Sequence, residues 1–92
     1  MDYRTFRKQL CRLTDRSADD ADALTEGLAR IIRESCADLD SVDIPRFGTF
    51  VPVKHEEEVI TDLSTGKRML VPPEINVEFH PGAMLTKRLR NE

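Results

Sequence analysis

The segment IPRFGTF, residues 44–50, lies where the chain changes from a helical to a β-type sequence pattern. β-Forming residues are dense around it, at Val42, Ile44, Phe47, Phe50, Val51 and Val53. Gly48 permits the close approach of another backbone or a bulge, while Pro45 and Pro52 favour edge or bulge positions. The segment is therefore predicted to begin a β-sheet.

The β pattern continues at Val59 and Ile60 and returns from Met69 to Phe79, on the far side of the turn signal Ser64-Thr65-Gly66. Residues 41–80 are thus predicted to contain three β-segments, among them a long β-hairpin. Few residues near the hairpin tip are able to fill a core, so the tip is expected to project into solvent or onto a partner.

Helical patterns flank this region. Apolar residues at helical spacing, Tyr3, Phe6, Leu10 and Leu13, predict a first helix, and a wide apolar stripe from Ala21 to Leu39 predicts a second. Ser17 followed by Asp20 resembles a capping box at the start of the second helix. Residues 1–40 are predicted to form a helical hairpin, and residues 81–92, after the Pro81-Gly82 break, a short C-terminal helix. The fold class is α+β.

Composition limits the possible functions. With 92 residues the chain is predicted to be a single domain with a thin core, which favours oligomerisation. Two cysteines exclude a disulfide framework, and no Cys or His spacing fits a zinc site, so no metal or cofactor is expected. No signal-like or membrane-spanning apolar run is present, which predicts a cytoplasmic protein without a membrane partner. The absence of catalytic motifs predicts a protein that is not an enzyme and has no small-molecule substrate.

Charge is segregated along the chain although the net charge is −3. Residues 1–16 carry five basic and two acidic side chains, residues 17–43 two basic and eight acidic, and residues 44–92 seven of each. Segregation of this kind matters more than the total for attracting a polyanion, and a solvated helix face explains it equally well.

Two segments resemble signatures of the HU and integration host factor family of bacterial histone-like proteins. One is Ile44-Pro45-Arg46-Phe47-Gly48-Thr49-Phe50, and the other is Val77-Glu78-Phe79-His80-Pro81-Gly82-Ala83-Met84-Leu85. The spacing between them places Ser64-Thr65-Gly66 at the tip of the family's β-arm. The resemblance implies that residues 41–80 form a three-stranded antiparallel sheet with an extended β-arm. It also implies an intertwined homodimer, or a heterodimer with a family relative, whose two arms reach around double-stranded DNA in the nucleoid. An apolar residue at each tip would wedge into a base step and bend the duplex through the minor groove, with low sequence specificity.

The arm departs from the family pattern. Leu63 stands where the family has a wedging proline, with Asp62 before it, and the ascending arm reads Lys54-His55-Glu56-Glu57-Glu58 where the family is rich in arginine. Lysines that the family often has near its last helix are replaced by His80, Ala83 and Thr86. These departures support an alternative function, a protein-interaction module or heterodimer subunit with weakened or lost DNA binding.

Nine residues are candidates for DNA contact under this resemblance. They are Arg46, Lys54, Leu63, Thr65, Lys67, Arg68, His80, Lys87 and Arg88. Each has a structural alternative, such as a solvated strand charge for Lys67 and Arg68, or turn formation for Thr65. A third possibility for the arm cations is cross-strand pairing with Glu56 and Glu58, which would compete with phosphate.

Buried positions are predicted as well. Phe6, Phe47, Phe50 and Phe79 are expected in the core, the last three at the subunit junction, and Cys11 and Cys36 are expected to be buried thiols.

Overall fold

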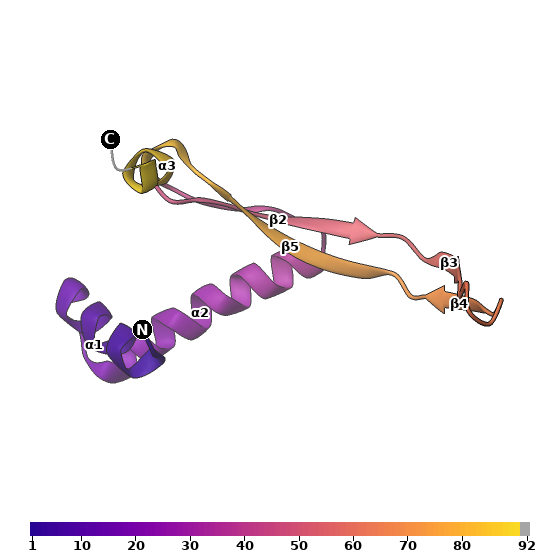
Figure 1. The fold of residues 1–92 in the computed structure, drawn as a ribbon. Helices are drawn as coiled ribbons and strands as arrows, with labels where there is room; N and C mark the ends of the chain where they lie inside the picture. Colours follow the sequence, from indigo (N-terminus) through magenta and orange to yellow (C-terminus); the bar gives the residue numbers. More distant parts are fainter. Residues whose placement is uncertain (91–92) are drawn as a thin grey trace. The chain divides into compact units, whose positions relative to one another are not determined.

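The computed structural model describes residues 1–90 and has the predicted α+β architecture (Figure 1). Three helices and five strands follow one another as α1 (Tyr3–Thr14), α2 (Ala18–Ala37), β1 (Val42–Ile44), β2 (Gly48–His55), β3 (Glu58–Thr61), β4 (Arg68–Val71), β5 (Glu74–Pro81) and α3 (Ala83–Arg90). They form two compact units, one from Met1 to Arg33 and one that begins at Glu34. Residues 91–92, the end of the predicted last helix, lie outside the described residues. No helix of the described part is long and apolar enough to cross a bilayer.

The first unit contains α1 and most of α2, and local hydrogen bonds set the helix ends. The Asp2 carboxylate accepts a hydrogen bond from the Thr5 amide at 2.9 Å and caps α1, which ends at Asp15 in the left-handed region with φ 53°. The Asp20 amide donates to Ser17 Oγ at 3.2 Å, which confirms the cap predicted for α2. Residues 15–17 alone separate the two helices.

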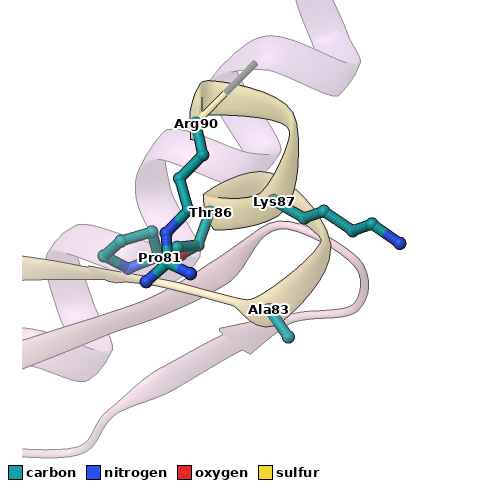
Figure 2. Close-up of a pocket in the computed structure, with 5 residues that line it drawn as sticks. All are labelled: Pro81, Ala83, Thr86, Lys87 and Arg90. Carbon is teal, nitrogen blue, oxygen red and sulfur yellow. The ribbon is translucent and has the colours of Figure 1, made fainter. Parts of the chain in front are cut away.

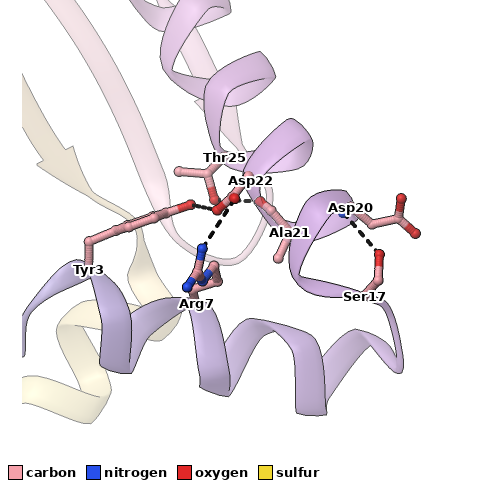
Figure 3. A network of polar contacts seen from close by, with 7 residues as sticks. All are labelled: Tyr3, Arg7, Ser17, Asp20, Ala21, Asp22 and Thr25. Atoms are coloured by element: carbon pink, nitrogen blue, oxygen red, sulfur yellow. Dashed lines mark hydrogen bonds and ion pairs between the residues drawn. The ribbon is translucent and has the colours of Figure 1, made fainter.

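A polar network joins α1 to α2 (Figure 3). The Tyr3 hydroxyl donates to Asp22 Oδ1 at 2.5 Å, and the Arg7 guanidinium lies 3.3 Å from Asp22 Oδ2. The hydrogen bond from Tyr3 is the main cause that lowers the pKa of Asp22, and the same bond raises the pKa of Tyr3. The network stabilises the charged carboxylate and fixes the register of the two helices.

The second unit is built on a three-stranded antiparallel sheet in the order β1-β2-β5. β2 is central only as far as Phe50, because β1 covers Gly48 to Phe50 and stops. Pro52 therefore has a neighbour only in β5, opposite Val77, in agreement with the predicted edge position. A Cβ at Gly48 would lie 2.5 Å from the His80 carbonyl oxygen and 2.7 Å from the Phe79 ring, so the close approach predicted at Gly48 is confirmed.

The arm is a continuation of the β2–β5 hairpin. The proximal ladder ends with His55 opposite Glu74, and the distal ladder begins with Glu58 opposite Val71. Two residues separate the ladders on each strand, so the register is unbroken. The interruption places Glu56 and Glu57 across from Pro72 and Pro73, which have no N–H to donate. The arm is thus divided into a proximal and a distal ladder because hydrogen bonds are lost between them. Neither strand slips along the other.

The predicted aromatic core is an exposed cluster in the single chain. Rings of Phe47, Phe50 and Phe79 lie 4.9 to 6.5 Å apart by their centroids, but Phe47 and Phe79 are 43% and 37% exposed. Phe6, in the first unit, is 42% exposed. Phe6 is therefore not buried in the single chain, whereas burial of Phe47, Phe50 and Phe79 at a subunit junction stays a prediction about a dimer.

Burial is sparse throughout the described residues. Only Ala21 and Cys36 are fully buried apolar residues, and Cys11 is half-buried, so the prediction holds for one cysteine of the two. Twenty large apolar side chains are exposed. A chain with so little interior requires additional apolar contacts for stability.

Candidate nucleic-acid interface

The arm tip is a four-residue loop between Asp62 and Lys67. The Asp62 amide donates to the Lys67 carbonyl at 2.8 Å and so closes the loop. Gly66 has φ 71°, a left-handed conformation that glycine adopts without strain, and the Lys67 amide donates to Thr65 Oγ1 at 3.3 Å. Thr65 and Gly66 thus shape the turn, as their residue types predict. Leu63 projects from this loop with 99% of its surface exposed.

Two cationic side chains, Lys67 and Arg68, follow the tip loop at the start of the descending strand. Lys67 immediately precedes β4, and Arg68 is the first residue of β4, opposite Thr61. Both are exposed, and within residues 1–90 neither forms an ion pair. Their side chains are therefore available to an external anion.

The alternative that Lys67 or Arg68 pairs across the arm with Glu56 or Glu58 is wrong. Glu58 lies opposite Val71, on the same face as Ile60 and Met69, whereas Arg68 belongs to the other face with Val59 and Leu70. Glu56 lies outside either ladder and is 3.8 Å from Lys54 Nζ. Strand alternation keeps Glu58 and Arg68 apart, and the Glu56 carboxylate lies beside Lys54 on its own strand.

Each face of the distal arm carries an apolar pair between the acidic segment and the cations. Val59 lies opposite Leu70 on one face, and Ile60 lies opposite Met69 on the other. All four side chains are exposed. Along the arm, the acidic residues 56–58 are followed by an apolar pair on each face and then by the tip, where the exposed Leu63 lies between Asp62 and the two cations.

Arg46 and His80 lie together near the start of α3. Arg46 occupies the turn between β1 and β2 with φ 66°, and the Phe47 amide donates to the Ile44 carbonyl at 3.1 Å across this turn. Arg46 and His80 both line one open hollow at the end of the sheet. His80 Nε2 is 3.1 Å from Glu78 Oε1, which places a carboxylate beside the ring. His80 is exposed near the end of β5, and its contact with DNA stays a prediction.

A second hollow lies against α3 (Figure 2). Its lining residues are Pro81, Ala83, Thr86, Lys87 and Arg90. Figure 2 shows the Arg90 side chain running back past Thr86 toward Pro81, whereas Lys87 extends away from the helix. Arg88 is exposed on the same helix and does not line the hollow. The nine candidates therefore separate into a tip set, a set around α3, and Lys54 between them beside Glu56.

Residues 1–90 match the family model described as bacterial DNA-binding protein. The chain belongs to the bacterial DNA-binding protein family. This assignment confirms the resemblance to HU and its relatives.

Solved structures with the same fold include two HU proteins. One is an Anabaena HU–DNA cocrystal structure, with 17% identity, a TM-score of 0.81 and complete coverage of both chains. The other is a mutant HU from Thermotoga maritima, with 16% identity, a TM-score of 0.69 and coverage of 97% of this chain and 99% of that chain. The sequence matches no curated protein.

Two residues that were not among the nine candidates, Arg90 and Asp62, also belong to the candidate interface. Arg90 lines the hollow beside α3, and its place among the last-turn cations of that helix was the available signal. Asp62 makes three hydrogen bonds in the tip loop, and the signal was the Asp-x-Ser spacing, which favours an Asx turn. Among residues 1–90, no group of three or more His, Cys, Asp and Glu side chains is placed to hold a metal ion.

Proposed function

We propose that this protein is an architectural DNA-binding protein of the nucleoid, which binds duplex DNA through the minor groove with paired β-arms and bends it with low sequence specificity. The family supports DNA binding, and an HU protein of the same fold crystallised with DNA supports the duplex as ligand. The observation that carries the proposal is the arm tip, where the exposed Leu63 lies beside the two unpaired cations Lys67 and Arg68.

A dimer supplies the second arm. Phe50, Phe79 and Val77 share one sheet face, and Phe79 and Val77 are exposed in the single chain. An uncovered aromatic cluster of this kind marks a protein contact. We place a second copy, or a basic relative of the family, on this face, which would bury the three aromatic rings of the sheet at the subunit junction as predicted from sequence.

The tip combines the two contacts that minor-groove bending requires. Lys67 and Arg68 neutralise phosphates, and each neutralised phosphate releases counterions, which favours binding at low salt. Leu63 is large and apolar, and insertion between base pairs exchanges its contact with water for contact with base faces. Unstacking costs a few kcal/mol, which the wider contact of a bent duplex offsets.

A second function is favoured by the acidic part of the arm. Glu56, Glu57 and Glu58 are exposed. Lys54 is the one lysine or arginine of the ascending strand, and its Nζ lies 3.8 Å from Glu56 Oε1 in an ion pair. Carboxylates at this place repel phosphates. The three carboxylates favour a heterodimer subunit or protein-interaction module with weakened DNA binding. In such a heterodimer, the basic partner would supply most of the contacts to DNA.

Binding of the purified protein to a duplex of about 30 base pairs separates these functions. Anisotropy is measured at about 50 and about 200 mM salt, with the oligomeric state measured in parallel by sedimentation. The architectural function predicts a dimer that binds at micromolar concentration or tighter and weakens steeply with salt. A dimer that leaves the duplex free at the lower salt concentration contradicts it and favours the interaction module.

A further inference from the structure

The tip loop is organised around a single residue, Asp62. Its amide donates to the Lys67 carbonyl at 2.8 Å, and its own carbonyl accepts from the Gly66 amide at 2.7 Å. Its carboxylate Oδ1 accepts from the Ser64 amide at 2.8 Å. Backbone and side chain of this one residue thus hold both ends of the loop and its second residue.

Leu63 has no packing contact to hold it in place. It is 99% exposed, so its position depends on the backbone on either side of it. Its neighbours are Asp62, which closes the loop, and Ser64, whose amide is bound to the Asp62 carboxylate. The φ and ψ angles that direct Leu63 are therefore fixed by the two hydrogen bonds that flank it.

A proline at the apex would be fixed by its own ring, which locks φ near −65°. Leucine has no such lock, and ordering a free loop at the moment of insertion costs backbone entropy. An Asx turn removes much of this freedom beforehand, since the side-chain acceptor imitates a backbone turn.

We propose that Asp62 is the positioning residue for the wedge: its carboxylate, bound to the Ser64 amide, presents Leu63 at the apex for insertion into a base step. The inference rests on the proposed DNA-bending function. Asp62 acts through Leu63 and makes no contact with the bases itself.

The charge of Asp62 is consistent with this role. The hydrogen bond from the Ser64 amide is the main cause that lowers the pKa of Asp62, so the carboxylate stays charged and accepting through the neutral range. A negative charge near phosphates weakens binding, which makes Asp62 a poor choice for affinity. Its value lies in the geometry of the turn, and two substitutions separate geometry from charge.

Asp62→Asn and Asp62→Ala remove the same charge, but only asparagine retains a side-chain oxygen that can accept from the Ser64 amide. Both variants are compared with wild type and with Leu63→Ala on a duplex of about 30 base pairs that carries a donor and an acceptor fluorophore at its ends. Anisotropy gives the affinity, and energy transfer at saturation gives the bend.

The inference predicts that D62N bends the duplex as wild type does, whereas D62A loses the bend to the extent that L63A does. D62N binds at least as tightly as wild type, because Lys67 and Arg68 remain and a repulsive charge is gone. Equal bending by D62A and D62N overturns the inference, as does an equal loss by both, which would assign the effect to charge.

Failure of the proposed function gives a different result. If wild type leaves the duplex unbound, the DNA-binding proposal fails and the role of Asp62 fails with it. If all four proteins bind and L63A bends fully, DNA binding stands, and the wedge with its positioning residue is rejected.

Discussion

Removal of the two tip cations, in Lys67→Ala/Arg68→Ala, has an effect on DNA affinity that follows from the structure. Both side chains are exposed and, in the described part of the chain, unpaired, so each is available to one phosphate. In the proposed dimer, the two arms would together supply four such contacts. Since each neutralised phosphate contributes about 0.9 to the slope of log K against log salt, the double substitution lowers the slope by about 3.6.

This slope converts into a measurable difference in affinity. Between about 50 and about 200 mM salt, the four contacts account for an affinity loss of about 150-fold in wild type that the variant does not show. A heterodimer with only one such arm has half the contacts and a slope change of about 1.8. Anisotropy titrations of a labelled duplex at several salt concentrations distinguish these values.

The matched control is Arg4→Ala/Lys8→Ala, which removes one arginine and one lysine from the exposed surface of α1. Its net charge is identical to that of the arm variant, so a general effect of charge appears equally in both. The account predicts that the slope of this control equals that of wild type. Equal slopes for the arm variant and wild type, or equal reductions in both variants, would refute the assignment of phosphate contact to the tip.

Three further predictions concern stability, measured as urea unfolding by circular dichroism. Gly48→Ala is expected to lower the free energy of unfolding by about 1–3 kcal/mol, because its Cβ would overlap the His80 carbonyl oxygen at 2.5 Å. The control is Gly27→Ala, where the added Cβ meets open space. Equal stability of G48A and wild type would contradict the close packing at Gly48. Ser17→Ala is expected to cost about 1 kcal/mol through loss of the α2 cap, whereas Ser17→Asp, which retains an acceptor, is expected to cost less; equal losses would contradict the capping role. Tyr3→Phe is expected to destabilise the protein at neutral pH, because it removes the hydrogen bond to the charged Asp22 carboxylate. A lowered carboxylate pKa gives stability that is fully present above its ordinary value of 3.8, so the difference from wild type is expected to vanish as the pH falls through the folded-state pKa of Asp22. A difference that persists at low pH contradicts the hydrogen bond to the charged form.

Local signals in the sequence predict the elements well. Apolar spacing at Tyr3, Phe6 and Leu10 predicts α1, the Ser17 cap predicts the start of α2, and Ser64-Thr65-Gly66 predicts the arm tip. Each of these features depends on residues a few positions apart, whose periodicity and side-chain chemistry are visible in one chain.

Features that depend on pairing between distant residues are not visible in the same way. The break in the arm requires Glu56 and Glu57 to meet Pro72 and Pro73, and the separation of Glu58 from Arg68 depends on which residues face each other. The sequence predicts the hairpin but leaves its register open, and a shift of one residue reverses every face.

Exposure of the aromatic residues has a different cause. Phe47 and Phe79 have the sequence pattern of core residues, and the pattern does not say which chain supplies the covering layer. The tip cations follow from the family resemblance, whereas the three hydrogen bonds of Asp62 depend on the closed loop, of which the Asp-x-Ser spacing shows only one part.

Photocrosslinking shows whether the arm tips are the part of this protein that inserts into DNA. A photoreactive phenylalanine analogue is placed at position 63 and, as the control, at position 13 in α1, where the native leucine is 80% exposed. The account predicts that irradiation of the DNA complex joins position 63 to bases of the duplex, and that position 13 gives no such product. Binding without a crosslink from position 63, or equal crosslinking from position 13, would contradict it.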